Sequence, residues 1–201
     1  MTGTRREAAA AMRARLVDAA IAQLADEGMR GLTHRRVEQR AEASQGLVKY
    51  HFGSLDGLIA AVVEHMADVE IGAVFRVTPE QQAAAAATGQ MPPEVWAAAK
   101  AAWAEITSRP ELVRARFELY LHAGRNPSLQ DAIRRGRDRF IEATAASFPT
   151  PDPRANAGLV LALVSGMLLH HVSAPDQALD ELAPGYMLAA GAAALILPLR
   201  P

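Results

Sequence analysis

The 201-residue chain contains no cysteine, which excludes disulfide bonds and thiolate metal sites and suits a reducing cell interior. It also lacks alternating runs of Val, Ile and Thr, whereas alanine runs are frequent and half of the residues are hydrophobic. Alanine loses no side-chain entropy in a helix, and β-branched residues lose χ1 freedom there. The composition therefore predicts an all-α protein that is long enough to bury a core.

Long apolar stretches are absent too. The longest largely apolar run, Ala157 to Leu169, has 13 residues and falls short of the ~20 needed to span a bilayer. Arginines at positions 5, 6, 13 and 15 border and interrupt the alanine-rich start, which argues against a signal peptide. We therefore expect a soluble, cytoplasmic protein with no membrane contact.

The net charge of −1 hides an asymmetry along the chain. Residues 1–53 hold nine Lys and Arg against six Asp and Glu, whereas residues 54–201 hold twelve against sixteen. A basic N-terminal part suits contact with a polyanion through one end of the molecule. Ordinary surface charge is the alternative, and an imbalance of three does not exclude it.

Apolar residues recur at three- and four-residue spacing and predict about nine helices and no strand. The first helix is expected from Arg5 to Asp26, with Gly28 as a left-handed stop. A fourth helix, from Leu55 to about Phe75, should carry the three before it. The remaining helices are expected at about 94–108, 110–124, 128–148, 154–172 and from beyond 176 to 197, with loops at 76–93 and 149–153. Pro184 and Gly185 should kink or interrupt the last helix near its start.

The stretch from Thr33 to Phe52 has the pattern of two short helices joined by a tight turn. Thr33 is a suitable N-cap for a helix ending near Ala41, and Ser44 for one from Gln45 to Phe52. Their inward residues lie on one side only, so most polar side chains point outward. Helices of about two turns cannot form a core alone, and the first and fourth helices must support them.

This stretch and its surroundings resemble the TetR family of bacterial transcriptional regulators over roughly residues 10–65. Beyond residue 80 the resemblance is limited to helix lengths and order and a Gly166-Met-Leu-Leu…Ala174-Pro-Asp segment. The residues that carry it are Leu32-Thr33, Ala41, Ser44-x-Gly46, Val48, Tyr50-His51-Phe52, Gly53-Ser54, Asp56 and Leu58.

The resemblance implies a DNA-binding domain at residues 1–53 and an effector-binding and dimerisation domain at 54–201, with the helix from about residue 55 as connector. It also implies a homodimer that pairs through helices eight and nine and binds a near-palindromic operator. Ligand binding would move the connecting helix, so that the two heads no longer match the groove spacing.

Four positions depart from the family pattern. Lys49 stands where Tyr is common, and Leu55 replaces a common Lys that would contact a phosphate. Glu42 occupies the place of a turn glycine, at a cost of ~1 kcal/mol if its backbone is left-handed. Ala43 lies where a larger apolar residue is usual. None of these changes breaks the architecture, but the first two alter the expected DNA footprint.

A helix fits the major groove, where its outer side chains reach base edges while flanking groups hold phosphates. The alternative is a helical hairpin that docks on another protein. Arginines 5, 6, 13 and 15 could reach the minor groove or flanking backbone, or be ordinary surface charges. We assign Gln45, Gly46, Leu47 and Lys49 to base edges; Thr33, His34, Arg35, Tyr50 and His51 mainly to phosphates; and Ser44 to a capping role that also allows a phosphate contact.

In the family, helices four to eight enclose the effector. Aromatic, Met and His side chains on these helices are our effector-binding candidates, although an apolar residue at helical spacing also serves a core. Together they suggest a largely apolar effector. Surplus apolar surface on the last two helices predicts dimerisation. The candidates are Met66, Trp96, Trp103, Phe117, Tyr120, Met167 and His170.

The leading hypothesis is a ligand-responsive repressor that binds a palindromic operator as a homodimer. No catalytic constellation is visible by spacing, so we expect no enzyme and no cofactor. No two histidines stand in HxxxH spacing, and the adjacent His170 and His171 diverge by ~100° on a helix, so we expect no metal site. The alternatives are a helical small-molecule-binding protein or enzyme that carries a helix-turn-helix, a protein-interaction module, and an activator of the same family.

Overall fold

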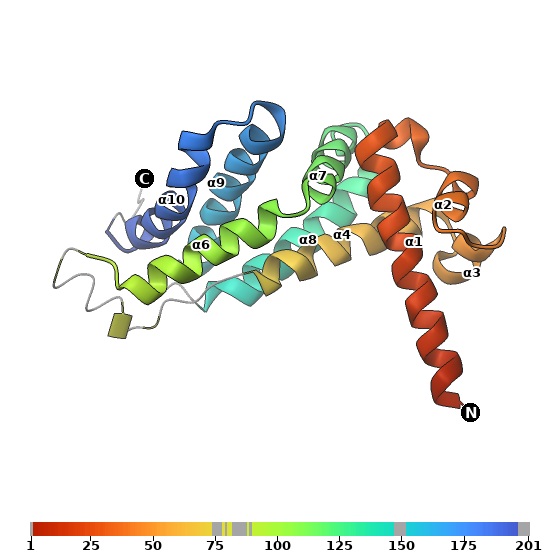
Figure 1. The fold of residues 1–201 in the computed structure, drawn as a ribbon, viewed down its shortest axis with the longest axis horizontal. Helices are drawn as coiled ribbons and strands as arrows, with labels where there is room; N and C mark the ends of the chain where they lie inside the picture. The colour runs from red at the N-terminus through yellow and green to blue at the C-terminus, as the bar shows by residue number, and fades with distance from the viewer. Residues whose placement is uncertain are drawn as a thin grey trace. The chain divides into compact units, whose positions relative to one another are not determined.

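The structure is a computed structural model that describes residues 2–73, 78, 80–81, 88, 90–146 and 152–196. Within these residues all nine regular elements are α-helices (Figure 1), so the predicted all-α class is confirmed. The expected last turns at Phe75, Phe148 and Leu197 lie outside the described residues. The helices are α1 (Thr2–Gly31), α2 (His34–Arg40), α3 (Leu47–Phe52), α4 (Leu55–Gly72), α6 (Pro93–Thr107), α7 (Pro110–Ala123), α8 (Pro127–Ala145), α9 (Pro153–Ser173) and α10 (Gln177–Ile196).

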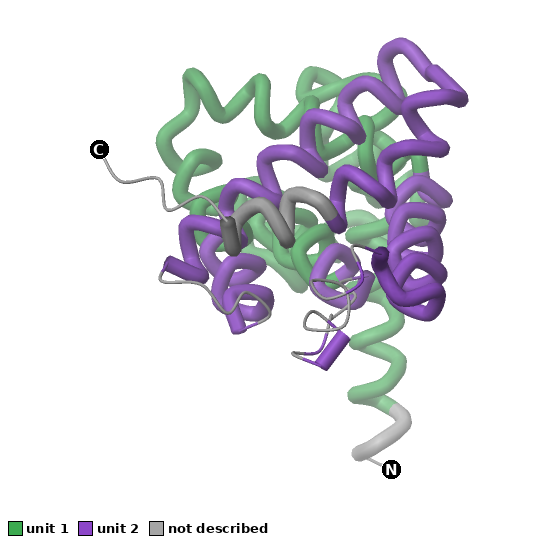
Figure 2. The backbone as a smooth tube through the Cα atoms, turned by 90° about the vertical axis from the view of Figure 1, so that its left-hand side faces the viewer, with its two compact units in different colours: residues 1–68, 110–137 green, residues 69–109, 138–201 purple. Residues whose placement is uncertain are grey.

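The helices group into two compact units, shown in different colours in Figure 2. Unit 1 comprises Met1–Asp68 and Pro110–Arg137, and unit 2 comprises Val69–Arg109 and Asp138–Pro201. The first three helices therefore share unit 1 with most of α4, all of α7 and the beginning of α8. The predicted domain boundary after residue 53 is a functional division and stays a prediction.

Unit 1 has a core of large aliphatic side chains, because α1 packs along α7 and against α2. Gly28 has the predicted positive φ of +64° and a non-helical backbone, so the first helix breaks there, and a short helical segment continues up to Gly31. The Glu118 carboxylate of α7 comes within 2.8 Å of the place a Cβ would take at Gly28, so the end of that flexible side chain would have to move for any other residue. The most buried side chains of this core are Leu16, Ile21, Leu24, Val37, Val48, Leu58, Val62 and Leu119.

Unit 2 is held together by α10, which packs against both α9 and α6. Val95 and Ala99 of α6 and Leu188 of α10 form a buried cluster between α6 and α10. Helix α10 runs from Gln177 to Ile196 with Pro184 inside it, so the interruption predicted at Pro184 and Gly185 is wrong, and the kink predicted as its alternative stays a prediction. A Cβ at Gly185 would lie 3.0 Å from the Trp96 ring, so this glycine lets α6 approach α10.

Prolines begin four of the helices, namely α6, α7, α8 and α9. Proline suits the first helical position because its φ is already helical and no intrahelical partner exists there for an N–H. For α8 and α9 the N-cap is the polar residue directly before the proline. Asn126 rather than Ser128 caps α8, since its side-chain oxygen accepts from the Leu129 N–H and the Ser128 hydroxyl. Asp152 caps α9 through the Ala155 N–H, at 3.0 Å.

Candidate nucleic-acid interface and ligand-binding region

The helix pair predicted between Thr33 and Phe52 is present in unit 1. Val37 of α2 and Val48 of α3 are fully buried and anchor the pair in the core of unit 1. Thr33 is the N-cap of α2, and its hydroxyl oxygen accepts from the Arg36 N–H at 3.3 Å, which confirms its capping role. The inner face of the pair therefore fixes which side chains remain outside.

The capping role predicted for Ser44 is wrong. Helix α3 begins at Leu47 rather than Gln45, its N-cap is Gly46 with a left-handed φ of +93°, and no cap side chain bonds to it. The acceptor comes from α2 instead. Glu38 Oε1 accepts from the N–H groups of Gly46 and Val48, each at 2.9 Å. Sequence reasoning missed Glu38, although a wheel sets it only about 60° from Ala41 on the inward arc.

The ten predicted DNA-contact residues all keep some surface on α2, the turn or α3. Tyr50 is 79% exposed and shows its ring edge to the neighbouring His51, with ring centroids 5.0 Å apart. Their individual roles stay predictions. Thr33, Arg35, Ser44, Gln45, Gly46, Lys49 and Tyr50 are exposed, and His34, Leu47 and His51 are half-buried.

Several arginines near this surface bind the head together. Arg13 of α1 stacks over the Phe52 ring, with its guanidinium carbon 5.0 Å from the centroid. Arg15 donates to the carbonyl of Ala41, at the end of α2. Ion pairs of Arg36 with Glu27 and of Arg40 with Asp26 also join α2 to the end of α1. All four N-terminal arginines predicted as possible DNA contacts are exposed, and two of them, Arg13 and Arg15, also have partners inside unit 1.

Two backbone features shape the ends of α3. Glu42, in the turn, has a positive φ of 49°, so the condition under which we expected a conformational cost at this position is met. Gly57, in the first turns of α4, lies so close to the Phe52 carbonyl oxygen that an added Cβ would come within 2.1 Å of it. Any other residue at position 57 would push the end of α3 away. No local sequence pattern indicates this close approach.

The effector-binding candidates are divided between the two units. In unit 1 Met66 is buried on α4, and Phe117 and Tyr120 of α7 meet edge to face with ring centroids 6.1 Å apart. In unit 2 Trp103 and Met167 are buried, whereas Trp96 is partly exposed and His170 is exposed. Their roles stay predictions.

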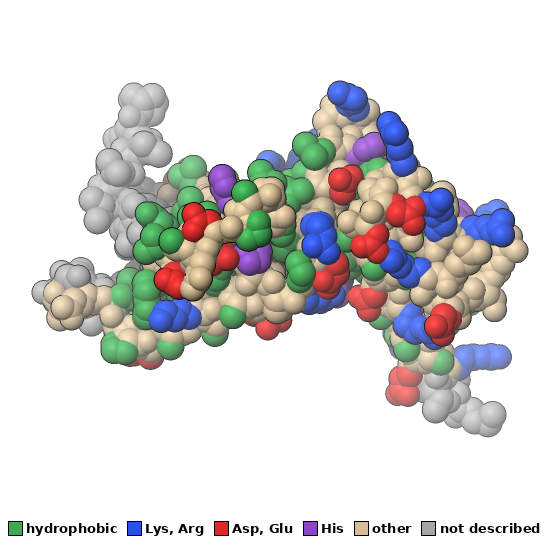
Figure 3. All heavy atoms as spheres, turned by 45° about the horizontal axis from the view of Figure 1, so that its top comes forward, with side chains coloured by type: hydrophobic (Ala, Val, Ile, Leu, Met, Phe, Trp, Pro, Cys, Tyr) green, Lys and Arg blue, Asp and Glu red, His purple; other side chains and the backbone are tan. Residues whose placement is uncertain are grey.

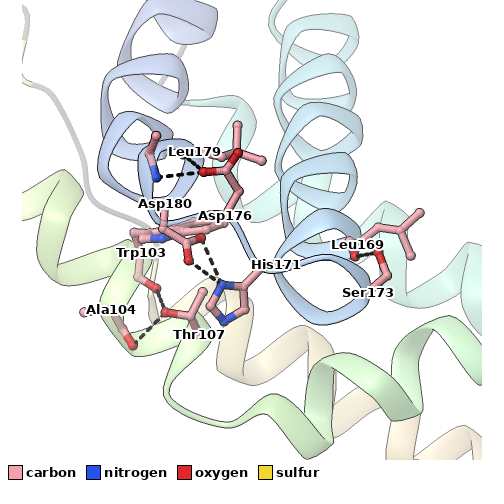
Figure 4. A network of polar contacts seen from close by, with 10 residues as sticks. Trp103, Ala104, Thr107, Leu169, His171, Ser173, Asp176, Leu179 and Asp180 are labelled. Atoms are coloured by element: carbon pink, nitrogen blue, oxygen red, sulfur yellow. Dashed lines mark hydrogen bonds and ion pairs between the residues drawn. The ribbon is translucent and has the colours of Figure 1, made fainter.

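A polar cluster in unit 2 surrounds Trp103 (Figure 4). The ring of His171, rather than that of the predicted His170, meets the Trp103 ring edge to face at a centroid distance of 6.0 Å. His171 Nδ1 lies 2.9 and 3.0 Å from the two carboxylate oxygens of Asp180, at the start of α10. The two adjacent histidines diverge on the helix, as expected, and the inward one links α9 to α6 and α10.

A charged residue is buried beside the aromatic pair of α7. Burial lowers the pKa of Arg116 from its ordinary value, and the neighbouring Tyr120 partly opposes this shift through its hydroxyl. The guanidinium carbon lies 5.5 Å from the Tyr120 ring centroid. Tyr120 therefore supports a buried cation, a role that does not depend on an effector.

Helix α9 is long and apolar enough, by length and composition, to cross a membrane, but a core helix of a soluble protein passes the same test. Only 28% of its 18-residue apolar window is buried within the chain. Apolar side chains accordingly lie at the surface of the part of unit 2 that contains α9 and α10 (Figure 3). Among the described side chains no group of three His, Asp or Glu is placed to hold a metal ion. The large apolar side chains that are exposed on α9 and α10 are Leu159, Leu163, Leu169, Leu182 and Tyr186.

Helix α3 is short and exposes its polar side, α2 packs against it, and α1 supports α2. This arrangement is the geometry of a helix-turn-helix DNA-binding domain. Residues 16–62 match the family described as bacterial regulatory proteins, tetR family. Residues 90–196 match the tetracyclin repressor-like C-terminal domain. The chain therefore belongs to the TetR family, and it is a DNA-binding transcriptional regulator.

Individual relatives agree with this assignment. The HTH-type transcriptional regulator BetI of Burkholderia mallei is 28% identical over 162 residues, which cover 78% of this chain and 80% of that protein. A putative TetR-family regulator from Rhodococcus sp. shares the fold with a TM-score of 0.68 at 21% identity, over 92% of this chain and 98% of that one. The multidrug binding protein EbrR, solved with proflavin, has a TM-score of 0.56 at 24% identity, over 89% and 99%.

Proteins of the TetR family bind operator DNA and small-molecule effectors, generally as dimers. They are soluble and typically not enzymes.

Proposed function

We propose that this regulator is a ligand-responsive repressor of the cytoplasm that binds a near-palindromic operator as a homodimer. The observation that carries the proposal is the exposed polar arc of α3, which is fixed by the buried Val48 on its other side. A six-residue helix held in this way enters the major groove as a rigid unit. The domain division follows: residues 1–53 read DNA, and residues 54–201 bind the effector and the twin subunit.

Within the reading head, we assign the side chains by reach and chemistry. Gln45, Leu47 and Lys49, with the backbone at Gly46, face base edges, and Leu47 suits a thymine methyl group. Lys49 is the one cation among these four positions and favours guanine acceptors. The phosphate contacts go to side chains at the rim of the helix pair. These are Thr33, His34, Arg35, Ser44, Tyr50 and His51.

The operator test is a selection of bound duplexes from a random pool, followed by affinity measurements at several salt concentrations. We expect a two-fold symmetric site and an affinity that falls steeply as salt rises. Lys49→Ala should relax preference at one base position in each half-site, by about 1–3 kcal/mol of lost discrimination. Tyr50→Phe should weaken all sites alike. Equal affinity for the selected site and random duplex at moderate salt would contradict the proposal.

For the homodimer, the support is the exposed apolar stripe of α9 and α10. Leu159 and Leu163 lie one turn apart on α9, as do Leu182 and Tyr186 on α10, so each pair shares a helix face. Exposed apolar surface of this kind marks a contact surface. Sedimentation equilibrium should give a dimer for the wild type and a monomer for Leu163→Glu. The control is Leu121→Glu, at a 78% exposed leucine of α7, which should remain a dimer.

For the effector, we propose a largely apolar, aromatic small molecule, because the candidate side chains are apolar or aromatic. They are Met66, Trp96, Trp103, Phe117, Tyr120, Met167 and His170. Proflavin, with which EbrR was solved, is a suitable first probe. Adding an effector to the repressor–operator complex should release the DNA and quench tryptophan fluorescence. A panel of apolar ligands that bind tightly but leave operator affinity unchanged would speak against ligand-responsive repression.

A further inference from the structure

Glu38 is a buried acidic residue of α2 whose carboxylate points to the backbone at the start of α3. It is 4% exposed on α2, and its Oε1 accepts from the N–H groups of Gly46 and Val48, each at 2.9 Å. Its backbone carbonyl accepts from the Ala43 N–H at 2.8 Å. One residue therefore holds the turn between the helices through its backbone and the start of α3 through its side chain.

Helix α3 depends on such an outside acceptor. It has only six residues, and a helix of that length does not persist alone in water. Its first N–H groups have no partner within the helix, and no side chain at Gly46 can supply one. A carboxylate is the strongest acceptor for backbone N–H groups, and its negative charge also matches the positive end of the helix. Two donors on one oxygen in turn satisfy the buried charge.

We propose that Glu38 is a positioning residue for DNA recognition. Its carboxylate fixes the left-handed backbone at Gly46 and the first turn of α3. It thereby sets the direction in which Gln45 leaves the turn and Leu47 leaves the helix. It sets base specificity without touching DNA. This proposal rests on the proposed base contacts of α3. The two hydrogen bonds from the Gly46 and Val48 N–H groups to the Glu38 carboxylate, which we call the Glu38 clamp, are a property of the free protein.

The variants separate the clamp from ordinary core stability. Glu38→Ala removes the acceptor, Glu38→Gln keeps an oxygen of the same reach without the charge, and Glu38→Asp keeps the charge on a shorter arm. Glu64→Ala is the matched control, because Glu64 is an exposed acidic residue of α4. All binding is measured at a temperature at which circular dichroism shows full folding. Should the alanine variant not fold, the aspartate variant carries the same comparison.

The first readout is the ratio of affinities for the selected operator and a scrambled duplex. For Glu38→Ala we expect operator binding at least about tenfold weaker, which equals about 1.4 kcal/mol. Binding to scrambled duplex should keep its affinity and salt slope, because phosphate contacts are made by other residues. Glu38→Gln should restore most of the ratio, and Glu64→Ala should match the wild type. A folded Glu38→Ala protein with wild-type preference overturns the proposal.

The second readout needs no DNA. Amide hydrogen exchange of Gly46 and Val48 should accelerate at least about tenfold in Glu38→Ala, while the amides of α4 keep their wild-type rates. Exchange at Gly46 and Val48 that is unchanged refutes the clamp even if operator binding falls. If the wild type shows no operator preference, the proposed function fails, and the exchange rates still decide whether Glu38 positions α3.

Discussion

Replacing Glu42 by glycine should stabilise the protein. Glu42 has a φ of +49° in the turn between α2 and α3, a left-handed conformation that costs an L-residue roughly 1–2 kcal/mol. Glycine removes this strain, but it adds roughly 0.4–1 kcal/mol of chain entropy to the unfolded state. The difference predicts that Glu42→Gly raises the free energy of unfolding by about 0.5–1 kcal/mol.

The matched control is Glu64→Gly, the same chemical change at an exposed position inside α4. There the backbone is helical, so glycine brings its entropy cost without relief of strain and should lower the free energy of unfolding by about 0.5–1 kcal/mol. Urea titrations at fixed protein concentration would show midpoints that move in opposite directions at an unchanged m-value. Equal destabilisation by both substitutions would refute the conclusion that the turn at Glu42 is strained.

The same urea titrations can test the close contacts of two further glycines, Gly57 with the Phe52 carbonyl and Gly136 with the Val63 side chain. Gly57→Ala should cost at least about 3 kcal/mol, because its Cβ would meet the Phe52 carbonyl at 2.1 Å and backbone cannot yield cheaply; Gly72→Ala, in open space on the same helix, should be neutral or slightly stabilising. Gly136→Ala should cost roughly 1–2 kcal/mol because its Cβ would lie 2.8 Å from the Val63 methyl group. That cost should vanish in a Val63→Ala background, and purely additive effects would contradict the contact.

Local pattern was sufficient to predict the elements. Three- and four-residue spacing predicted the helices and their order, and Thr33 predicted the start of α2. The family pattern marked Glu42 as the place where a left-handed backbone would be costly, and its φ is positive. These features depend on neighbours within a few residues, so the sequence carries them directly. The helix starts at prolines are local features too. The starts predicted at 94 and 154 are one residue late, because Pro93 and Pro153 are themselves the first helical residues and the N-cap is the residue before each proline.

Contacts between helices could not be predicted in this way. The cap of α3 comes from Glu38 across the turn, so a search for a capping side chain next to the helix selected Ser44 wrongly. Pro184 and Gly185 suggested a break, whereas the glycine serves the approach of Trp96 and α10 continues. Such residues are selected by partners far away in sequence, and a single chain without its fold does not identify them.

Helix α3 owes its conformation to residues to which we assign no contact with the bases. Its first turn depends on the Glu38 carboxylate, its last residue is confined by Gly57, and Arg13 covers the Phe52 ring. A helix of six residues held at both ends can change its outward side chains without losing its direction, because none of these supports involves Lys49 or the positions beside it. We therefore expect different effects from substitutions at Lys49 and at Glu38: the first should change which bases are preferred, and the second should lower the preference for the operator altogether.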